Sequence, residues 1–106
     1  MLFTQKVLNG FQMIHRTAAA EIPAARAGHR VFIGVYPPYD EKRISHWRVR
    51  RFEIPKDLVD KFFGEEDLVD SELIELNTLE EVEELLAKWN VDSASFEAPW
   101  KNDWPL

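Results

Sequence analysis

Apolar residues near the start of the chain recur at the spacing of an amphipathic helix. The positions that share this face, at steps of three or four residues, are Phe3, Val7, Phe11, Ile14 and Ala18. This stripe predicts a helix from about Thr4 to Ala20. Gly10 in its interior costs about 1 kcal/mol relative to alanine, and a strand over "FQMIHR" is the open alternative. The following "EIPAARAGH" contains proline and glycine and indicates a connection that ends near residue 29.

A continuous apolar stretch over residues 30–36, "RVFIGVY", predicts a β-strand. It is rich in β-branched and aromatic residues and is apolar at both parities, as in a strand covered on both faces. Gly34 interrupts the pattern and indicates a point where another backbone approaches. Two prolines and the polar "YDEKRIS" then predict a connecting loop, the segment of the domain that we expect to be most mobile.

A second strand is predicted in "HWRVRRFEI", which would complete an antiparallel hairpin over residues 30–54. Its apolar residues divide between the two parities: Trp47 and Val49 on one, Phe52 and Ile54 on the other. A regular strand would point these pairs to opposite faces, whereas a β-bulge near Arg50 and Arg51 would turn all four to the core.

The second half of the chain predicts helices and one ambiguous segment. After Pro55, "KDLVDKFFG" predicts a short helix over 56–63 that ends at Gly64. "EEDLVDSELIEL" is compatible with a helical turn followed by an extended "LIEL". Thr78, followed at the third position by Glu81, matches a capping box at the start of a helix over 79–89.

These elements predict an α+β fold in one domain: a small antiparallel hairpin or sheet packed against two to three α-helices. The parts are an N-terminal helix and connection (1–29), the hairpin (30–54), an acidic helical part (55–90) and a tail with Trp and Pro (91–106). No stretch approaches the 18 to 20 apolar residues, roughly, of a membrane span, and no segment resembles a signal peptide. We therefore expect a cytoplasmic protein without a membrane partner.

Charge is divided unevenly along the chain, whose net charge is −6. Residues 1–53 contain nine Lys or Arg and four Asp or Glu, a charge of +5, whereas residues 54–106 contain four and fifteen, a charge of −11. The two halves either neutralise each other within the fold or present separate surfaces to partners.

The acidic part predicts a binding surface for a basic protein. Small, acidic, Trp-bearing domains without catalytic motifs resemble bacterial immunity proteins in general character, and an acidic surface can occupy the cationic groups with which a toxin nuclease holds phosphate. The leading hypothesis is thus a non-catalytic inhibitor or immunity protein, and the simpler alternative for the glutamates is a solvated helix face. The predicted partner-binding residues are Glu80, Glu81, Glu83, Glu84, Asp67, Asp70, Trp100 and Trp104.

Two other functions remain open. The basic residues of the hairpin predict, as an alternative, a nucleic-acid-binding module. The residues of this alternative are Arg48, Arg50, Arg51, Lys42 and Arg43. The second is a small enzyme in which His46 works with Asp40 or Glu41. Since the chain has no cysteine and its three histidines match no metal-binding spacing, we expect no metal, no cofactor and no catalytic residues.

Overall fold

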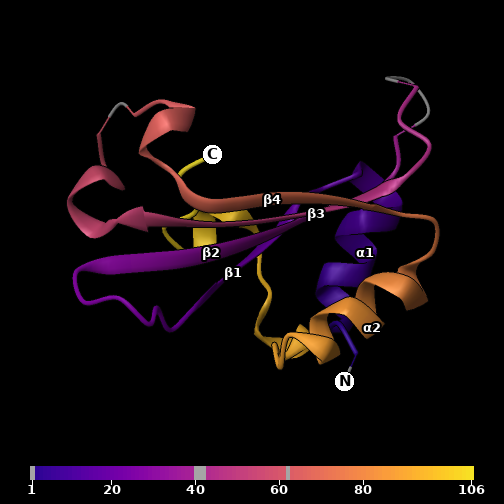
Figure 1. The fold of residues 1–106 in the computed structure, drawn as a ribbon. Coiled ribbons are helices and arrows are strands. Elements are labelled where there is room, and N and C mark those ends of the chain that lie inside the picture. Colours follow the sequence, from indigo (N-terminus) through magenta and orange to yellow (C-terminus); the bar gives the residue numbers. More distant parts are fainter. Residues whose placement is uncertain (1, 40–42, 62) are drawn as a thin grey trace.

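The computed structural model describes residues 2–39, 43–61 and 63–106, which form one four-stranded antiparallel sheet and two α-helices (Figure 1). The strands lie in the order β1-β2-β3-β4. In chain order the elements are α1 (Gln5–Ile14), β1 (Ala18–Ile22), β2 (His29–Tyr36), β3 (Trp47–Pro55), β4 (Val69–Leu76) and α2 (Leu79–Lys88). The α+β class is confirmed, and the hairpin forms the centre of a wider sheet.

The two central strands are covered on both faces, as the pattern of β2 predicts. β2 and β3 pair without interruption, so that Val35 lies opposite Val49 and Phe32 opposite Phe52. The bulge near Arg50 and Arg51 that would turn all apolar residues of β3 to one side therefore does not form between these two strands, and the regular alternative holds. An irregularity does occur between Arg51 and Glu53, but in the pairing of β3 with β4. Trp47 and Val49 point to one face of the sheet, and Phe52 and Ile54 point to the other. Each face has its own hydrophobic core, so no bulge is needed.

One face of the sheet, which we call the helix face, packs against α1 and α2 (Figure 1). The buried residues of this core include Phe11 from α1, Val49 from β3 and Leu86 from α2. Phe3 and Phe11 meet edge to face at 5.3 Å between ring centroids, and Phe11 meets Trp47 in the same way at 5.2 Å. Burial of these apolar faces is the main source of stability for both helices.

The opposite face, which we call the tail face, is covered by the C-terminal segment and by the segment that follows β3. Phe32, Phe52 and Ile54 are fully buried there, and Trp104 packs on them, with 5.4 Å between the ring centroids of Phe52 and Trp104. Gly34 leaves the space for Trp104, because a Cβ at Gly34 would lie 2.4 Å from Cη2 of Trp104. Gly34 therefore lies at a close approach, as predicted, but its neighbour is the side chain of Trp104 and not another backbone.

The N-terminal helix is shorter than its apolar stripe predicts. α1 ends at Ile14 because His15 takes a left-handed conformation with φ 52°, and the N–H of Arg16 then donates to the carbonyl of Gly10 at 3.0 Å. Ala18, which the prediction placed on the helical stripe, begins strand β1. The connection predicted up to residue 29 therefore contains a strand. Alanine is not favoured in β-strands, so β1 forms because it pairs with β2 and not because of its own residues.

The helix predicted over 56–63 is wrong in extent. A 3₁₀-helix spans Lys56–Leu58, turns follow, and Phe62 lies outside the described residues. Gly64 has φ −107° and precedes the 3₁₀-helix Glu65–Asp67, so it does not end a helix in the left-handed conformation. In the ambiguous segment the helical turn thus comes first, at Glu65–Asp67, and the extended part is the whole of β4.

The start of α2 agrees with its cap. The Thr78 hydroxyl accepts a hydrogen bond from the N–H of Glu81 at 3.2 Å. The Glu81 carboxylate contacts that hydroxyl at 3.4 Å, where a capping box would pair it with the N–H of Thr78. α2 ends at Lys88, and Asn90 follows in the left-handed region with φ 63°.

The C-terminal segment runs along the outer edge of β1 before it crosses to the tail face (Figure 1). Ala19 and Glu97 exchange two backbone hydrogen bonds of 2.9 and 3.0 Å, and Nδ2 of Asn102 donates to the carbonyl of Ala19 at 2.9 Å. Two 3₁₀-helices, Ser93–Ser95 and Pro99–Lys101, flank this contact. The tail is thus docked on the rest of the fold.

Within the described residues, neither helix could cross a membrane, because each has 10 residues and a span needs about 20.

Candidate functional site

The register of the sheet places arginines of β3 beside acidic residues of β4. Arg48 lies opposite Glu75, and Arg51 lies opposite Glu72. Cross-strand pairs of opposite charge each contribute about 0.2 to 1 kcal/mol. The two halves of the chain therefore do face each other along the β3–β4 boundary, where acidic residues of the second half lie opposite arginines of the first.

Among the described residues, three ion pairs connect the basic half directly with the acidic half. Arg50 Nη2 lies 2.8 Å from a carboxylate oxygen of Glu65. The other two join Arg26 to Asp70 at 3.5 Å and Arg30 to Asp103 at 2.8 Å.

Arg30 is the most completely paired of these arginines. Its Nη2 also lies 2.6 Å from Glu21, and the hydrogen bonds to Glu21 and Asp103 raise the pKa of Arg30 above its usual value. Among the described residues, ion pairs thus engage Arg26, Arg30 and Arg50, three of the nine Lys and Arg residues of the first half.

The glutamates of α2 have no such partner. In the part of the chain that the structure describes, no Lys, Arg or His lies within salt-bridge distance of Glu80, Glu81, Glu83 or Glu84. Glu80 and Glu84 are exposed, and Glu81 and Glu83 are half-buried. Glu80 and Glu81 have a structural role as well, since negative charge in the first turn stabilises a helix.

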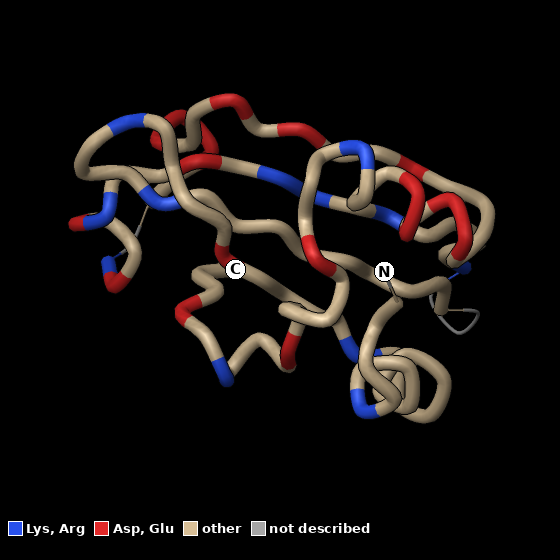
Figure 2. Tube along the Cα trace, turned by 90° about the horizontal axis from the view of Figure 1, so that it is seen from below, with Lys and Arg blue, Asp and Glu red and all other residues tan. Residues whose placement is uncertain are grey.

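Helix α2 lies beside β4, and both elements have exposed acidic residues, of which Glu75, opposite Arg48, points to the tail face. α2 contacts β3 and β4, and Figure 2 shows acidic residues along both α2 and β4. The exposed acids of β4 are Asp70, Glu72 and Glu75. β4 is also an edge strand, and its outer side has no partner strand among the described residues. We refer to Glu80, Glu81, Glu83 and Glu84 with these three residues as the acidic edge.

Asp67 and Asp70, both predicted to bind a partner, are less available than the α2 glutamates. Asp67 is half-buried, and its Oδ2 accepts a hydrogen bond from the N–H of Gly64 at 2.9 Å. Asp70 pairs with Arg26, yet its side chain remains 75% exposed. Asp70 therefore belongs to the acidic edge, whereas Asp67 holds the turn before β4.

The structure does not bring the two C-terminal tryptophans to the acidic edge. The 3₁₀-helix that contains Trp100 contacts β1, at the edge of the sheet opposite β4. Trp104 is half-buried on the tail face. Trp100 remains 67% exposed, and Arg16 lies over its ring with Cζ 4.7 Å from the centroid. Five of the eight predicted partner-binding residues thus lie on the acidic edge, whereas Asp67, Trp100 and Trp104 each lie elsewhere.

The residues of the nucleic-acid alternative do not form one surface. Arg48 and Arg50 lie on the tail face, with Arg48 over the ring of Tyr36 at 5.1 Å. Arg51 points to the helix face and lies over Trp89 at 5.1 Å. Arg43 is exposed in the connection between β2 and β3.

Lys42, the fifth residue of that alternative, lies outside the described residues.

The histidine and carboxylate site predicted around His46 cannot be placed, since Asp40 and Glu41 lie outside the described residues. Nδ1 of His46 contacts the hydroxyl of Ser45 at 3.1 Å. His15 stacks on Tyr39, with ring centroids 4.4 Å apart.

A different histidine meets a carboxylate. His29 Nδ1 lies 2.8 Å from Oε2 of Glu53, which is buried and also pairs with Arg26 at 3.0 Å. Sequence reasoning missed this cluster, which a register for the predicted hairpin would have indicated. Since Val31 lies opposite Glu53, His29 and Glu53 share a face in diagonal positions.

Among the described residues, no three His, Asp or Glu side chains gather as metal ligands would.

In comparisons with known protein families, with curated proteins and with solved structures, this chain matched none. Arguments about its function therefore rest on its own residues.

Proposed function

We propose that this protein is a non-catalytic binding protein that holds a basic protein partner on its acidic edge. The observation that carries the proposal is the group of four α2 glutamates, which have no cationic partner among the described residues, beside an edge strand that is itself acidic. A cluster of this kind attracts a basic surface and repels nucleic acid.

The partner class that fits best is a protein whose own function requires a positive surface, such as a toxin nuclease. The acidic edge would occupy the cations that otherwise hold phosphate, so binding and inhibition would be one event. This makes an inhibitor or immunity protein the most specific form of the proposal. The two tryptophans are not needed for it, because they lie at the other edge of the sheet or on the tail face.

The nucleic-acid alternative receives less support. Of the three arginines on β3, Arg50 is paired with Glu65 and Arg51 points to the helix face. The net charge of −6 also opposes an encounter with a polyanion.

The test compares two double variants with the same change in net charge. Glu80→Lys with Glu84→Lys reverses the exposed acids of α2, whereas Asp57→Lys with Asp60→Lys reverses two exposed acids in the segment after β3. Each variant and the unaltered protein would be immobilised and exposed to a lysate of the source organism at low and at high salt. Retained proteins would be identified by mass spectrometry, and circular dichroism would verify that all three proteins fold.

The expected result is one basic protein that the unaltered chain and the control variant retain at low salt and release at high salt. The α2 variant should bind the purified partner at least about tenfold more weakly, equivalent to about 1.4 kcal/mol. Equal retention by the α2 variant, or a retained partner without excess positive charge, would contradict the proposal. If the partner is a nuclease, a stoichiometric amount of the chain should also suppress its activity.

A further inference from the structure

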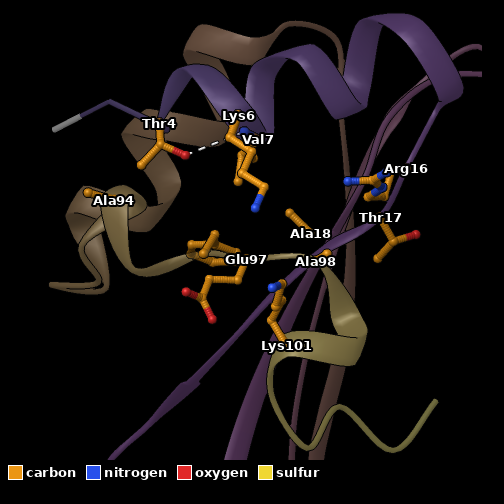
Figure 3. A pocket seen from close by; sticks show the side chains of 11 residues that line it. Thr4, Lys6, Val7, Arg16, Thr17, Ala18, Ala94, Glu97, Ala98 and Lys101 are labelled. Atoms are coloured by element: carbon orange, nitrogen blue, oxygen red, sulfur yellow. Dashed lines mark hydrogen bonds between the residues drawn. The ribbon is translucent and has the colours of Figure 1, made fainter.

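A cavity of about 330 Å³ lies beside the β1 edge, between α1, the start of β1 and the C-terminal segment (Figure 3). Its apolar walls include the buried side chains of Val7, Ala18 and Phe96. The volume is at the small end of the range of roughly 300 to 1,000 Å³ that is typical of small-molecule sites. The cavity forms only when the C-terminal segment docks, because its walls come from both ends of the chain.

The polar part of this cavity is positive, although the chain as a whole is acidic. Lys6, Arg16 and Lys101 line it, and Figure 3 shows their nitrogen atoms turned toward the same space. In the described ranges none of the three has a carboxylate within salt-bridge distance. Glu97 is the one acidic residue of the lining, and its carboxylate points away from the three cations (Figure 3).

Arg16 is held in position by apolar contacts. Its guanidinium lies over the ring of Trp100, with Cζ 4.7 Å from the centroid. On the α1 side it packs near Gly10, where a Cβ would lie 3.5 Å from Cδ of Arg16. Nε of Arg16 is buried and has no hydrogen-bond partner among the described residues. Buried donors are normally paired, so the site offers a fixed cation with an unsatisfied N–H.

We propose that this cavity binds a small molecule that carries an oxyanion, a carboxylate or a phosphate, on an apolar body. The anion would lie among Lys6, Arg16 and Lys101, and the apolar body would contact Val7 and Phe96. A guanidinium presents several donors in a plane that matches either oxyanion. This site goes beyond the proposed function, because it uses different residues at the opposite edge of the sheet.

The proposal can be tested with phenyl phosphate as the probe. Benzoate would serve as the carboxylate probe, and benzyl alcohol as an uncharged control of similar size. Binding would be followed by nuclear magnetic resonance in low salt, with the Nε–H of Arg16 and the indole N–H of Trp100 as reporters. Phenyl phosphate or benzoate should shift both signals in a saturable manner, and their relative affinities show which oxyanion is preferred. Benzyl alcohol should leave both signals unchanged.

Variants then assign binding to the cavity. Lys101→Gln and Arg16→Gln should each weaken binding of the better probe about tenfold or more, as expected for the loss of a charged contact. Lys56→Gln removes an exposed cation that does not line the cavity and should leave the affinity unchanged. No saturable shift with either anion, or equal weakening by Lys56→Gln, would overturn the proposal. Because Lys101 is exposed, its variant remains informative even if Arg16→Gln fails to fold.

The same variants separate this site from the acidic edge. Lys101→Gln should retain the basic partner as the unaltered protein does, and the Glu80→Lys, Glu84→Lys variant should bind the probe with unchanged or slightly higher affinity. Loss of probe binding in that α2 variant would contradict the assignment, since neither glutamate lines the cavity.

Discussion

Substitution of Gly34 by alanine should destabilise the protein only when Trp104 is present. A Cβ at Gly34 would lie 2.4 Å from Cη2 and 2.7 Å from Cζ2 of Trp104, closer than atoms can approach. Trp104 would have to leave its position against Phe52, from which its ring centroid is 5.4 Å away. The C-terminal segment would then lose its main apolar contact with the tail face.

The magnitude follows from the burial of Trp104. Truncation of a fully buried Trp costs about 3 to 5 kcal/mol, so Trp104→Ala, which acts on a half-buried side chain, should cost about 2 to 3 kcal/mol. Gly34→Ala alone should cost about 1 to 3 kcal/mol, as is usual when extra atoms enter a packed site. In the Trp104→Ala background the new methyl group has no indole ring to clash with. Gly34→Ala should then stabilise the protein by about 0.4 to 1 kcal/mol, because alanine gives the unfolded chain less conformational freedom than glycine does.

Urea unfolding of four proteins would measure this coupling: the unaltered chain, Gly34→Ala, Trp104→Ala and the double variant. Far-ultraviolet circular dichroism is the appropriate signal, because one substitution removes a fluorophore. We expect a coupling energy of about 2 kcal/mol, within the range for residues in contact. Gly10→Ala, whose methyl group would lie near Arg16, is the matched control and should show no coupling with Trp104→Ala. An equal cost of Gly34→Ala in both backgrounds would refute the docked position of Trp104.

Two further predictions concern the cap of α2 and the half-buried phenol of Tyr36. Thr78→Ala removes the side-chain acceptor of the Glu81 N–H and should lower the free energy of unfolding by about 1 kcal/mol, whereas Thr78→Ser should restore most of it; an equal loss in both variants would contradict the role of the hydroxyl. Burial raises the pKa of Tyr36, against the opposing charges of Arg50 and Arg48. The unfolded chain therefore releases this proton first, and stability should fall as the pH rises above about 10. Urea unfolding at pH 9 and pH 11 should show a larger decrease for the unaltered protein than for Tyr36→Phe, and equal decreases would contradict this cause.

Local patterns were sufficient for elements whose stability is largely local. The cap residue Thr78 and the apolar face of α2 predicted that helix within one residue at its end, because hydrogen bonds within a helix connect neighbours along the chain. The apolar run of β2 likewise predicted a strand with two covered faces. A strand with one face in water alternates apolar and polar residues, whereas β2 is apolar at successive positions. Charge asymmetry was also visible in the sequence, as was the acidic character of α2.

The sequence could not determine the contacts between segments that are distant along the chain. β1 is recognisable only through its pairing with β2, because its three alanines favour a helix locally. The position of Trp104 over Gly34 joins residues 70 positions apart, and no local pattern encodes it.

The same limit applies to both candidate sites. Whether the acid of the second half meets positive charge depends on the register of β3 with β4, which sets Glu72 and Glu75 opposite arginines, whereas no cation among the described residues lies within salt-bridge distance of the α2 glutamates. The positive cavity exists because docking of the tail brings Lys101 to Arg16. Composition therefore determined how much charge of each sign the protein has, whereas the tertiary structure determined which charges remain available, because electrostatic attraction depends on distance in space and not on position in the chain.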